Sequence, residues 1–310
     1  MERISTASSY SAIIANLMAS EARVNQINAQ VSSGENATDL KGYASNAETL
    51  MAMQAVQTQV TGYLNTGQVV TAKLSSQNSA LTQIASSASQ AQTAVANALA
   101  AGNGDTVMQA LQSAFSNAVQ GLNTTFNGQY LFSGGQVNTP PVSATSLSDL
   151  TNAPTIASLF HNDQTIQTAQ VDQNTTLNTG FLASNLGTNL FNAFQAIQAF
   201  NQGPNGPFGG TLTAAQTSFL QSQISVFNGQ ASALNTAAGQ NGLLQSEVSN
   251  TQTDLSNQQT SVQGLIGNIV TADPATAAAN LAQAQLAIQA SAKVFQSLSN
   301  SSLVNLLPNN

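Results

Sequence analysis

The sequence predicts a mostly α-helical protein, an elongated rod of long antiparallel helices with coiled-coil-like packing. Its N- and C-terminal helices pair, and a small β-rich domain is inserted between the two halves. Apolar residues recur at heptad spacing in several separate segments. One segment continues from Ala47 to Ala100, which corresponds to a helix of roughly 80 Å at ~1.5 Å per residue. Glycine and proline cluster between the segments and mark their ends.

The first helix is predicted to end at Gly34, and residues 35–45 are predicted to form a loop. In the long helix, one heptad position includes Gly67 and the other includes Gln77. Gly67 indicates either a close helix approach or a weak point. Gln77 indicates either a register-setting polar contact or a slip in the heptad frame. Gly102 and Gly104 are predicted to end this helix.

A third helix is predicted to carry one apolar stripe, formed by Met108, Leu111, Phe115, Ala118, Leu122 and Phe126. Two glycines and two prolines then follow within a dozen residues, and the runs 130–132 and 165–171 are typical of short strands. A short helix with Leu190, Phe194 and Ile197 comes next, and residues 201–210 are predicted to form a loop.

Helical patterning returns in two segments, one on each side of Gly239 to Gly242. Asp273 and Pro274 predict the start of the last helix, with the aspartate as its cap and the proline in its first turn. The predicted organisation is an assembly helix (1–42), a first half of the rod (43–128), a β-rich outer domain (129–186), a second half of the rod (187–270) and a C-terminal assembly helix (271–310).

The composition excludes several classes of protein. Only 5% of the residues are charged, against about 25% in an average soluble protein. The net charge is −7 and the five basic residues are scattered, so neither nucleic acid nor an anionic membrane surface is an expected partner. Cysteine is absent, which excludes disulfides and thiolate metal sites. No secretory signal and no apolar run long enough to span a membrane are evident.

Catalytic and metal-binding chemistry is not expected. His161, the one histidine, is predicted to lie at a surface turn without catalytic partners. Asp149, Asp163 and Asp172 are too far apart in the sequence for a calcium loop. The Ser-x-Lys tripeptide at Ser291 falls on a helix face. We therefore expect no enzyme activity, no cofactor and no metal.

The two ends of the chain are the candidate functional surface, because each terminal helix is amphipathic and too short of apolar surface to be stable as a lone pair. The apolar C-terminal tail either folds onto the protein's own core or joins neighbouring subunits. Residues assigned to assembly in the N-terminal helix are Ile4, Tyr10, Ile13, Leu17, Val24, Ile27 and Val31. Those in the C-terminal helix are Leu281, Ile288, Phe295, Leu298, Leu303, Leu306 and Leu307.

Several motifs resemble the flagellin superfamily. The opening residues 1–5 resemble the start of the hook–filament junction members, and residues 31–34 match the Ser-Ser-Gly that closes the first helix. Residues 127–141 resemble the junction members at the entry to their outer domain, and residues 287–307 resemble the shared C-terminal ending. Residues 38–44 depart from the family because they lack its acidic pair.

The resemblance implies a structural subunit of the bacterial flagellum, an extracellular homo-oligomer that forms the hook–filament junction by helical self-assembly. It also implies contacts with another hook-associated protein and with flagellin. Export unfolded through the flagellar type III apparatus, without a cleaved signal, is expected, with an export chaperone on the C-terminal helix. Filament flagellin is the alternative, and a surface adhesin that binds glycans through the β insert is an alternative of another class.

Overall fold

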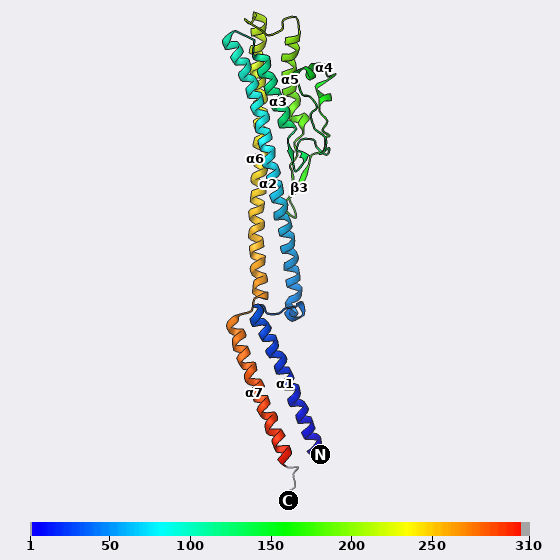
Figure 1. The fold of residues 1–310 in the computed structure, drawn as a ribbon, viewed down its shortest axis with the longest axis vertical. Helices are drawn as coiled ribbons and strands as arrows, with labels where there is room; N and C mark the ends of the chain where they lie inside the picture. The colour runs from blue at the N-terminus through cyan, green and yellow to red at the C-terminus, as the bar shows by residue number, and fades with distance from the viewer. Residues whose placement is uncertain (1, 305–310) are drawn as a thin grey trace. The chain divides into compact units, whose positions relative to one another are not determined.

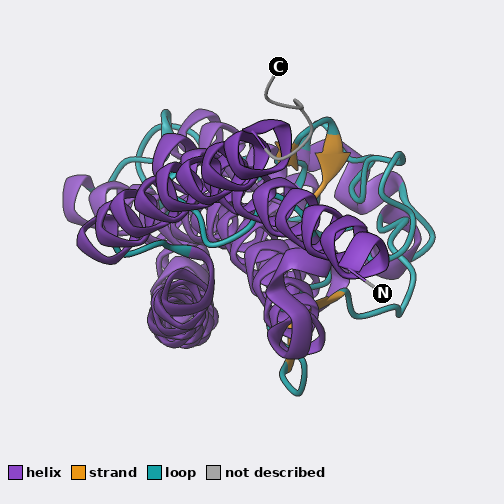
Figure 2. Ribbon diagram, turned by 90° about the horizontal axis from the view of Figure 1, so that it is seen from below, coloured by secondary structure: helices purple, strands orange, loops and turns teal. Residues whose placement is uncertain are grey.

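A computed structural model describes the backbone of residues 2–304 and the side chains of residue 8 and residues 10–297. The chain divides into two compact units. The terminal unit comprises residues 1–59 and 258–310, and the central unit comprises residues 60–257. Helices dominate both units and the strands are short (Figure 2), which confirms the mostly α-helical fold with a small β part.

Two helices run side by side in the terminal unit, α1 (Glu2–Ser33) and α7 (Pro274–Val304) (Figure 1). The predicted start of α7 is confirmed. Oδ1 of Asp273 accepts a hydrogen bond from the backbone N–H of Ala275 at 2.9 Å, and Oδ2 accepts one from the Thr276 hydroxyl at 2.8 Å. The aspartate thereby satisfies a donor that the first turn of a helix leaves without a partner.

Helix α1 ends where the sequence predicts, because Gly34 adopts a φ of 72° that side chains disfavour. The loop predicted for residues 35–45 is wrong in part, since a 3₁₀ helix, η1, occupies Leu40–Asn46. Its cap is Asp39, whose Oδ1 accepts the Gly42 N–H at 2.8 Å. A Cβ on Gly42 would lie 2.4 Å from that of Ala37, so this turn requires glycine.

Two long helices run alongside each other (Figure 1), α2 (Ala47–Ala101) and α6 (Ala214–Val270), and their residues 60–101 and 214–257 belong to the central unit. Helix α2 is unbroken, as predicted, and ends just before Gly102. Helix α6 is also unbroken, so its predicted separation into two segments at residues 239–242 is wrong. A Cβ on Gly239 or Gly242 would meet no atom within 4 Å, which places both glycines at the solvent-facing side of a helix held by its other face.

Helices α3 (Val107–Leu122) and α5 (Ala183–Gln202) pack with α2 and α6 around one apolar core. Phenylalanine rings connect three of these helices. Phe115 of α3 lies 5.0 Å from Phe191 and 5.5 Å from Phe194 of α5, and Phe194 lies 5.1 Å from Phe227 of α6, measured between ring centroids. These rings are fully buried, so the central unit has a complete core of its own.

The stripe predicted for α3 includes one residue too many, because Phe126 belongs to a strand. Strands β1 (Thr125–Phe126) and β2 (Gln129–Tyr130) pair antiparallel around Asn127 and Gly128, both with positive φ. An Asn-Gly turn with two positive φ angles is the hairpin turn that matches strand twist. This turn chemistry overrides the continuing apolar pattern.

The segment between α3 and α5 also contains α4 (Leu147–Asn152), the 3₁₀ helix η2 (Ile156–Leu159) and a second hairpin. Strands β3 (Thr168–Gln170) and β4 (Thr176–Asn178) pair antiparallel, with Ala169 opposite Leu177. Leu177 and Val171 pack with Val70 and Leu74 of α2 and Val248 of α6 in a small second cluster. The insert is therefore fixed to the long helices of the central unit.

Candidate assembly surface

The seam between α1 and α7 is built from the apolar stripes that the sequence assigns to assembly. Tyr10, Ile13, Leu17 and Val24 of α1 are half-buried there and Ile27 is buried. On α7, Leu281 and Ile288 are half-buried, and the small residues Ala277 and Ala284 between them are buried. The seam thus covers one stripe on each helix and leaves most of its large side chains partly in solvent.

Two of the residues predicted for assembly are more exposed than the others. Val31 is 50% exposed and lies in the last turn of α1. Phe295 is 37% exposed, although its ring meets the ring of Tyr10 edge-on with centroids 5.7 Å apart. Five further positions lack described side chains or lie outside the described residues. Ile4, Leu298 and Leu303 are described in backbone only, and Leu306 and Leu307 lie outside the described residues.

A second set of apolar residues on these helices points to solvent, and the single-stripe reasoning missed it. Met18 is 65% exposed and Leu286 is 64% exposed, and Ile14 and Val294 are also exposed. Ile14 and Met18 are four residues apart, so they lie on one face of α1. That spacing was visible in the sequence as a second stripe beside the first. The pair therefore has apolar side chains on its outer surface as well as in its seam.

Charged groups are sparse on this surface. Within α1 and α7 the charged residues are Glu2, Arg3, Glu21, Arg23 and Lys293. The hollow that Arg23 lines, of about 230 Å³, is otherwise formed by serine, asparagine, glutamine and alanine. Covering such a surface with another protein costs less desolvation than covering lysine and glutamate.

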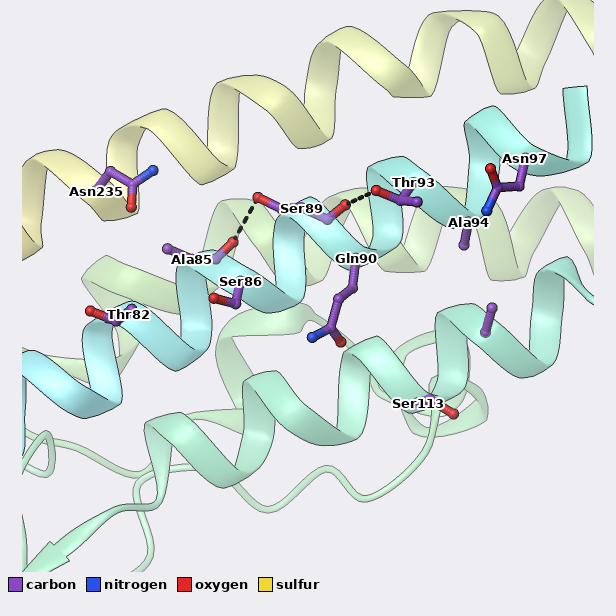
Figure 3. Close-up of a pocket in the computed structure, with 11 residues that line it drawn as sticks. Thr82, Ala85, Ser86, Ser89, Gln90, Thr93, Ala94, Asn97, Ser113 and Asn235 are labelled. Atoms are coloured by element: carbon purple, nitrogen blue, oxygen red, sulfur yellow. Dashed lines mark hydrogen bonds between the residues drawn. The ribbon is translucent and has the colours of Figure 1, made fainter. Parts of the chain in front are cut away.

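The groove drawn in Figure 3, of about 680 Å³, lies in the central unit between α2 and α3, with Asn235 of α6 at one side. Its eleven lining residues are all uncharged serine, threonine, asparagine, glutamine or alanine. Two of its hydroxyls are bonded within their own helix, Ser89 to the Ala85 carbonyl at 3.3 Å and Thr93 to the Ser89 carbonyl at 2.9 Å. The groove therefore offers neither an activated nucleophile nor a general base.

The titratable groups serve local structure. Asp163 accepts the backbone N–H groups of Gly135 and Thr165 at 2.8 and 2.9 Å, and these bonds hold the pKa of its carboxyl below the ordinary value. His161 is exposed, as predicted, but it lies beside the bridge between Val142 and Phe160 and not at a turn, and its backbone N–H donates to the Pro141 carbonyl. Ser291 is half-buried in the seam and Lys293 is exposed; residues two apart do not face each other on a helix.

Within the described part of the chain, no group of histidine and acidic residues is placed to hold a metal ion. None of the described helices combines the length and the apolarity that crossing a bilayer requires.

Comparisons with known proteins agree with this architecture. The family model of the bacterial flagellin N-terminal helical region matches residues 4–137, and that of the C-terminal helical region matches residues 224–307. No curated protein sequence matches the chain.

Solved structures that share the fold include two from Vibrio parahaemolyticus and Bacillus cereus. A protein from Vibrio parahaemolyticus described as a flagellar hook-associated protein is 15% identical, with a TM-score of 0.59 over 73% of this chain and 97% of the other. FlgL from Bacillus cereus is 13% identical, with a TM-score of 0.52 over 71% of this chain and 99% of the other.

The N-terminal region includes residues 4–33 of α1, the C-terminal region includes all of α7, and residues 138–223 lie between the two regions. Proteins with these regions are structural components that self-assemble and contact other flagellar components, and their role is not enzymatic. The chain belongs to the flagellin family of bacterial flagellar structural proteins.

Proposed function

We propose that this chain forms the junction between hook and filament of a bacterial flagellum, by helical self-assembly through α1 and α7. The observation that carries the proposal is the surface of this helix pair. Its seam is only half-buried, and Met18 and Leu286 are about two-thirds exposed on its outside. Each such side chain stabilises a contact by about 1.5–3 kcal/mol when fully buried. A few of them per subunit are enough to favour polymerisation.

Added head to tail with a constant screw step, identical copies form an open tube. The low charge of α1 and α7 suits this packing, because neighbouring copies then bring few like charges together. Completion of the seam by neighbouring copies also accounts for the contrast with the central unit, whose core is complete within one chain.

Two features support a junction role over that of filament flagellin. Residues 127–141 resemble the junction members, and they form the turn between β1 and β2, strand β2 and the loop after it. Two solved structures with this fold, the Vibrio parahaemolyticus protein and FlgL, are matched over nearly their whole length. Nearly all of each of these proteins is therefore matched by about 70% of this chain.

Removing residues 302–310 tests the assembly step. Full-length protein is expected to polymerise above a critical concentration in sedimentation assays, and the truncated chain is expected to remain monomeric with an unchanged central unit by amide exchange. Equal polymerisation of both chains, or a full-length chain that stays monomeric at every concentration, would contradict the proposal.

Immunogold labelling of detached flagella separates the junction from the filament. A thin band at the base of the filament is expected for the junction protein. Label along the whole filament would identify filament flagellin instead. Label on the cell body without flagella would favour an adhesin.

Export through the flagellar type III apparatus and a chaperone for the C-terminal helix belong to the same proposal. Leu286 and Val294 are exposed on α7 in the single chain, and an apolar helix face of this kind fits a helix-binding groove. Loss of the protein from the culture medium when the export apparatus is inactivated would support this route, and undiminished secretion would contradict it.

A further inference from the structure

The α1–α7 seam does not determine its own register. Its α1 residues fall into two rows seven residues apart, Tyr10, Leu17 and Val24 in one and Ile13, Ser20 and Ile27 in the other. The α7 rows have the same spacing, with Ala277, Ala284 and Ser291 in one and Leu281, Ile288 and Phe295 in the other. A shift of seven residues, about 10.5 Å along a helix, therefore brings similar side chains together again.

The chain segments that connect α1 and α7 to the long helices differ in how well they resist such a shift. Helix α7 follows α6 after only residues 271–273, so the chain itself fixes where α7 begins. Helix α1 is joined to α2 through residues 34–46, and a connection of this length can absorb a displacement of about 10 Å at ~3.3 Å per extended residue. Some contact outside the seam must set the position of α1.

Asn36 makes that contact. Its side-chain amide donates to the carbonyls of Ile269 at 2.8 Å and Thr271 at 3.1 Å, and its backbone N–H donates to the Val270 carbonyl at 2.7 Å. The last carbonyls of a helix have no partner within the helix. Asn36 thus caps the C-terminus of α6 from a distant part of the chain.

The neighbours of Asn36 tie this cap to both terminal helices. The N–H of Ala272, just before α7, donates to the Gly34 carbonyl at 2.9 Å, at the end of α1. The side chain of Gln30, within α1, donates to the Asn36 carbonyl at 2.6 Å. We call residues 34–36 and 269–272 the clasp. It contains an antiparallel bridge between Glu35 and Thr271.

The central unit has a similar bridge between Asn103 and Thr211, where Asp105 accepts the N–H of Gly210. There the neighbouring Phe208 is buried against the large core, so apolar packing also sets the register. In the clasp, residues 34–36 and Thr271 are exposed, and the one buried residue is Ala272, whose side chain is a single methyl group. The register of the terminal unit therefore depends on hydrogen bonds much more than the register of the central unit does.

We infer that Asn36 is a positioning residue for assembly, which selects one of several heptad-related registers of α1 against α7. Its consequence for polymerisation rests on the proposed function, because a shifted α1 presents Ile14 and Met18 to a neighbouring copy about 10.5 Å out of place. The register itself is a property of the single chain.

Engineered cysteine pairs test the register, since the chain has no cysteine of its own. Ser20 and Ala284 line one hollow, so oxidation is expected to join Ser20→Cys to Ala284→Cys in the parent chain. Ser291→Cys lies one heptad further along and is expected to react poorly with Ser20→Cys. In Asn36→Ala, the yield of the cross-link between positions 20 and 284 is expected to fall. The yield of a cross-link from position 20 to Ser291→Cys, or to Ala277→Cys, is expected to rise, because each lies one heptad away from position 284.

Amide exchange and a matched control accompany the cross-links. Residues 271 and 272 are expected to exchange about tenfold faster in Asn36→Ala, the change that loss of one net hydrogen bond produces. The control is Asn28→Ala, because Asn28 is exposed on α1. It is expected to change neither the cross-link yields nor the exchange rates. Unchanged cross-links in Asn36→Ala overturn the inference. Loss of all three cross-links also overturns it, because Asn36 would then be needed for docking and not for register.

The rate of polymerisation is the third measurement. Asn36→Ala is expected to polymerise at least tenfold more slowly, and closing the 20–284 disulfide is expected to restore its rate. A slow rate that the disulfide fails to restore overturns the inference. If the parent chain does not polymerise at all, the proposed function fails, while the cross-link result still decides the role of Asn36.

Discussion

Gln77 of α2 donates its side-chain amide to the backbone carbonyl of Thr179, with 3.0 Å between Nε2 and the oxygen. Gln77 is 0% exposed and lies on the apolar stripe between Leu74 and Leu81, both of which are also buried. The heptad frame therefore continues through Gln77 without a slip. Its polar side chain attaches the segment that follows β4 to the long helix.

Replacing Gln77 by alanine is expected to loosen the β3–β4 hairpin. The Thr179 carbonyl would lose its partner in a buried position, which costs about 1–3 kcal/mol of unfolding free energy. Chemical denaturation measures this loss, and faster amide exchange in residues 168–178 locates it.

Gln68→Ala is the matched control, because Gln68 is exposed on the same helix. It is expected to leave both measurements unchanged. Equal hairpin exchange in the two variants would show that the Gln77 bond does not hold the hairpin.

Gly121 and Gly67 predict opposite outcomes for the same substitution. A Cβ on Gly121 of α3 would lie 2.6 Å from Cγ1 of Ile84, inside the core. Gly121→Ala is therefore expected to lower the unfolding free energy by about 1–3 kcal/mol, through overpacking.

The three atoms nearest to a Cβ on Gly67 all belong to the side chain of Gln252, the first at 2.8 Å, and that side chain can rotate away. Alanine also has a helix propensity about 1 kcal/mol better than glycine. Gly67→Ala is therefore expected to be neutral or stabilising in the same denaturation experiment. A Gly121→Ala variant as stable as Gly67→Ala would show that the α2–α3 approach is not tight.

Much of the fold could be predicted because its signals are local. The end of α1 at Gly34, the end of α2 before Gly102 and the start of α7 at Asp273 each depend on residues within one turn. The continuity of α6 could not be predicted, because Leu234, Asn241 and Val248 hold it against neighbours distant in sequence. Phe126 was misplaced because an Asn-Gly turn ended a pattern that apolar spacing alone would have continued.

The α1–α7 seam could be predicted in outline, because its heptad spacing is also a local signal. Heptad spacing identified the seam residues, but it could not show that Val31 leaves the seam or that Met18 remains exposed. Asn36 was missed entirely. A polar residue in a linker carries no periodic signal, and its partners at residues 269–271 are more than 230 positions away.

Acid is expected to destabilise the folded chain. Backbone N–H groups of Thr145 and Ser146 hold the pKa of Asp149 below its ordinary value. Donors from nearby turns lower the pKa of four other aspartates in the same direction: Asp105, Asp163, Asp172 and Asp273. A folded-state pKa below the unfolded one contributes stability that is present above the unfolded value and is lost as pH falls.

The Tm is therefore expected to be steady near neutral pH and to decline once the pH falls below about 4, where unfolded aspartate takes up protons. Thermal melts across this range measure the effect. Asp149→Asn should show a weaker decline, because one of the five groups no longer titrates. A Tm that rises on acidification would contradict the assignment of these carboxylates.

Met18 and Leu286 separate assembly from folding. Both are exposed in the single chain, so Met18→Ser and Leu286→Ser are expected to change the unfolding free energy by no more than about 0.5 kcal/mol. If neighbouring copies bury them, each substitution removes about 1.5–3 kcal/mol from the subunit contact. The critical concentration for polymerisation, measured by sedimentation, should then rise by roughly tenfold to a hundredfold.

Leu243→Ser is the control, because Leu243 is 72% exposed on the central unit. A rise for Leu243→Ser that equals the other two would move the assembly surface away from the terminal helices.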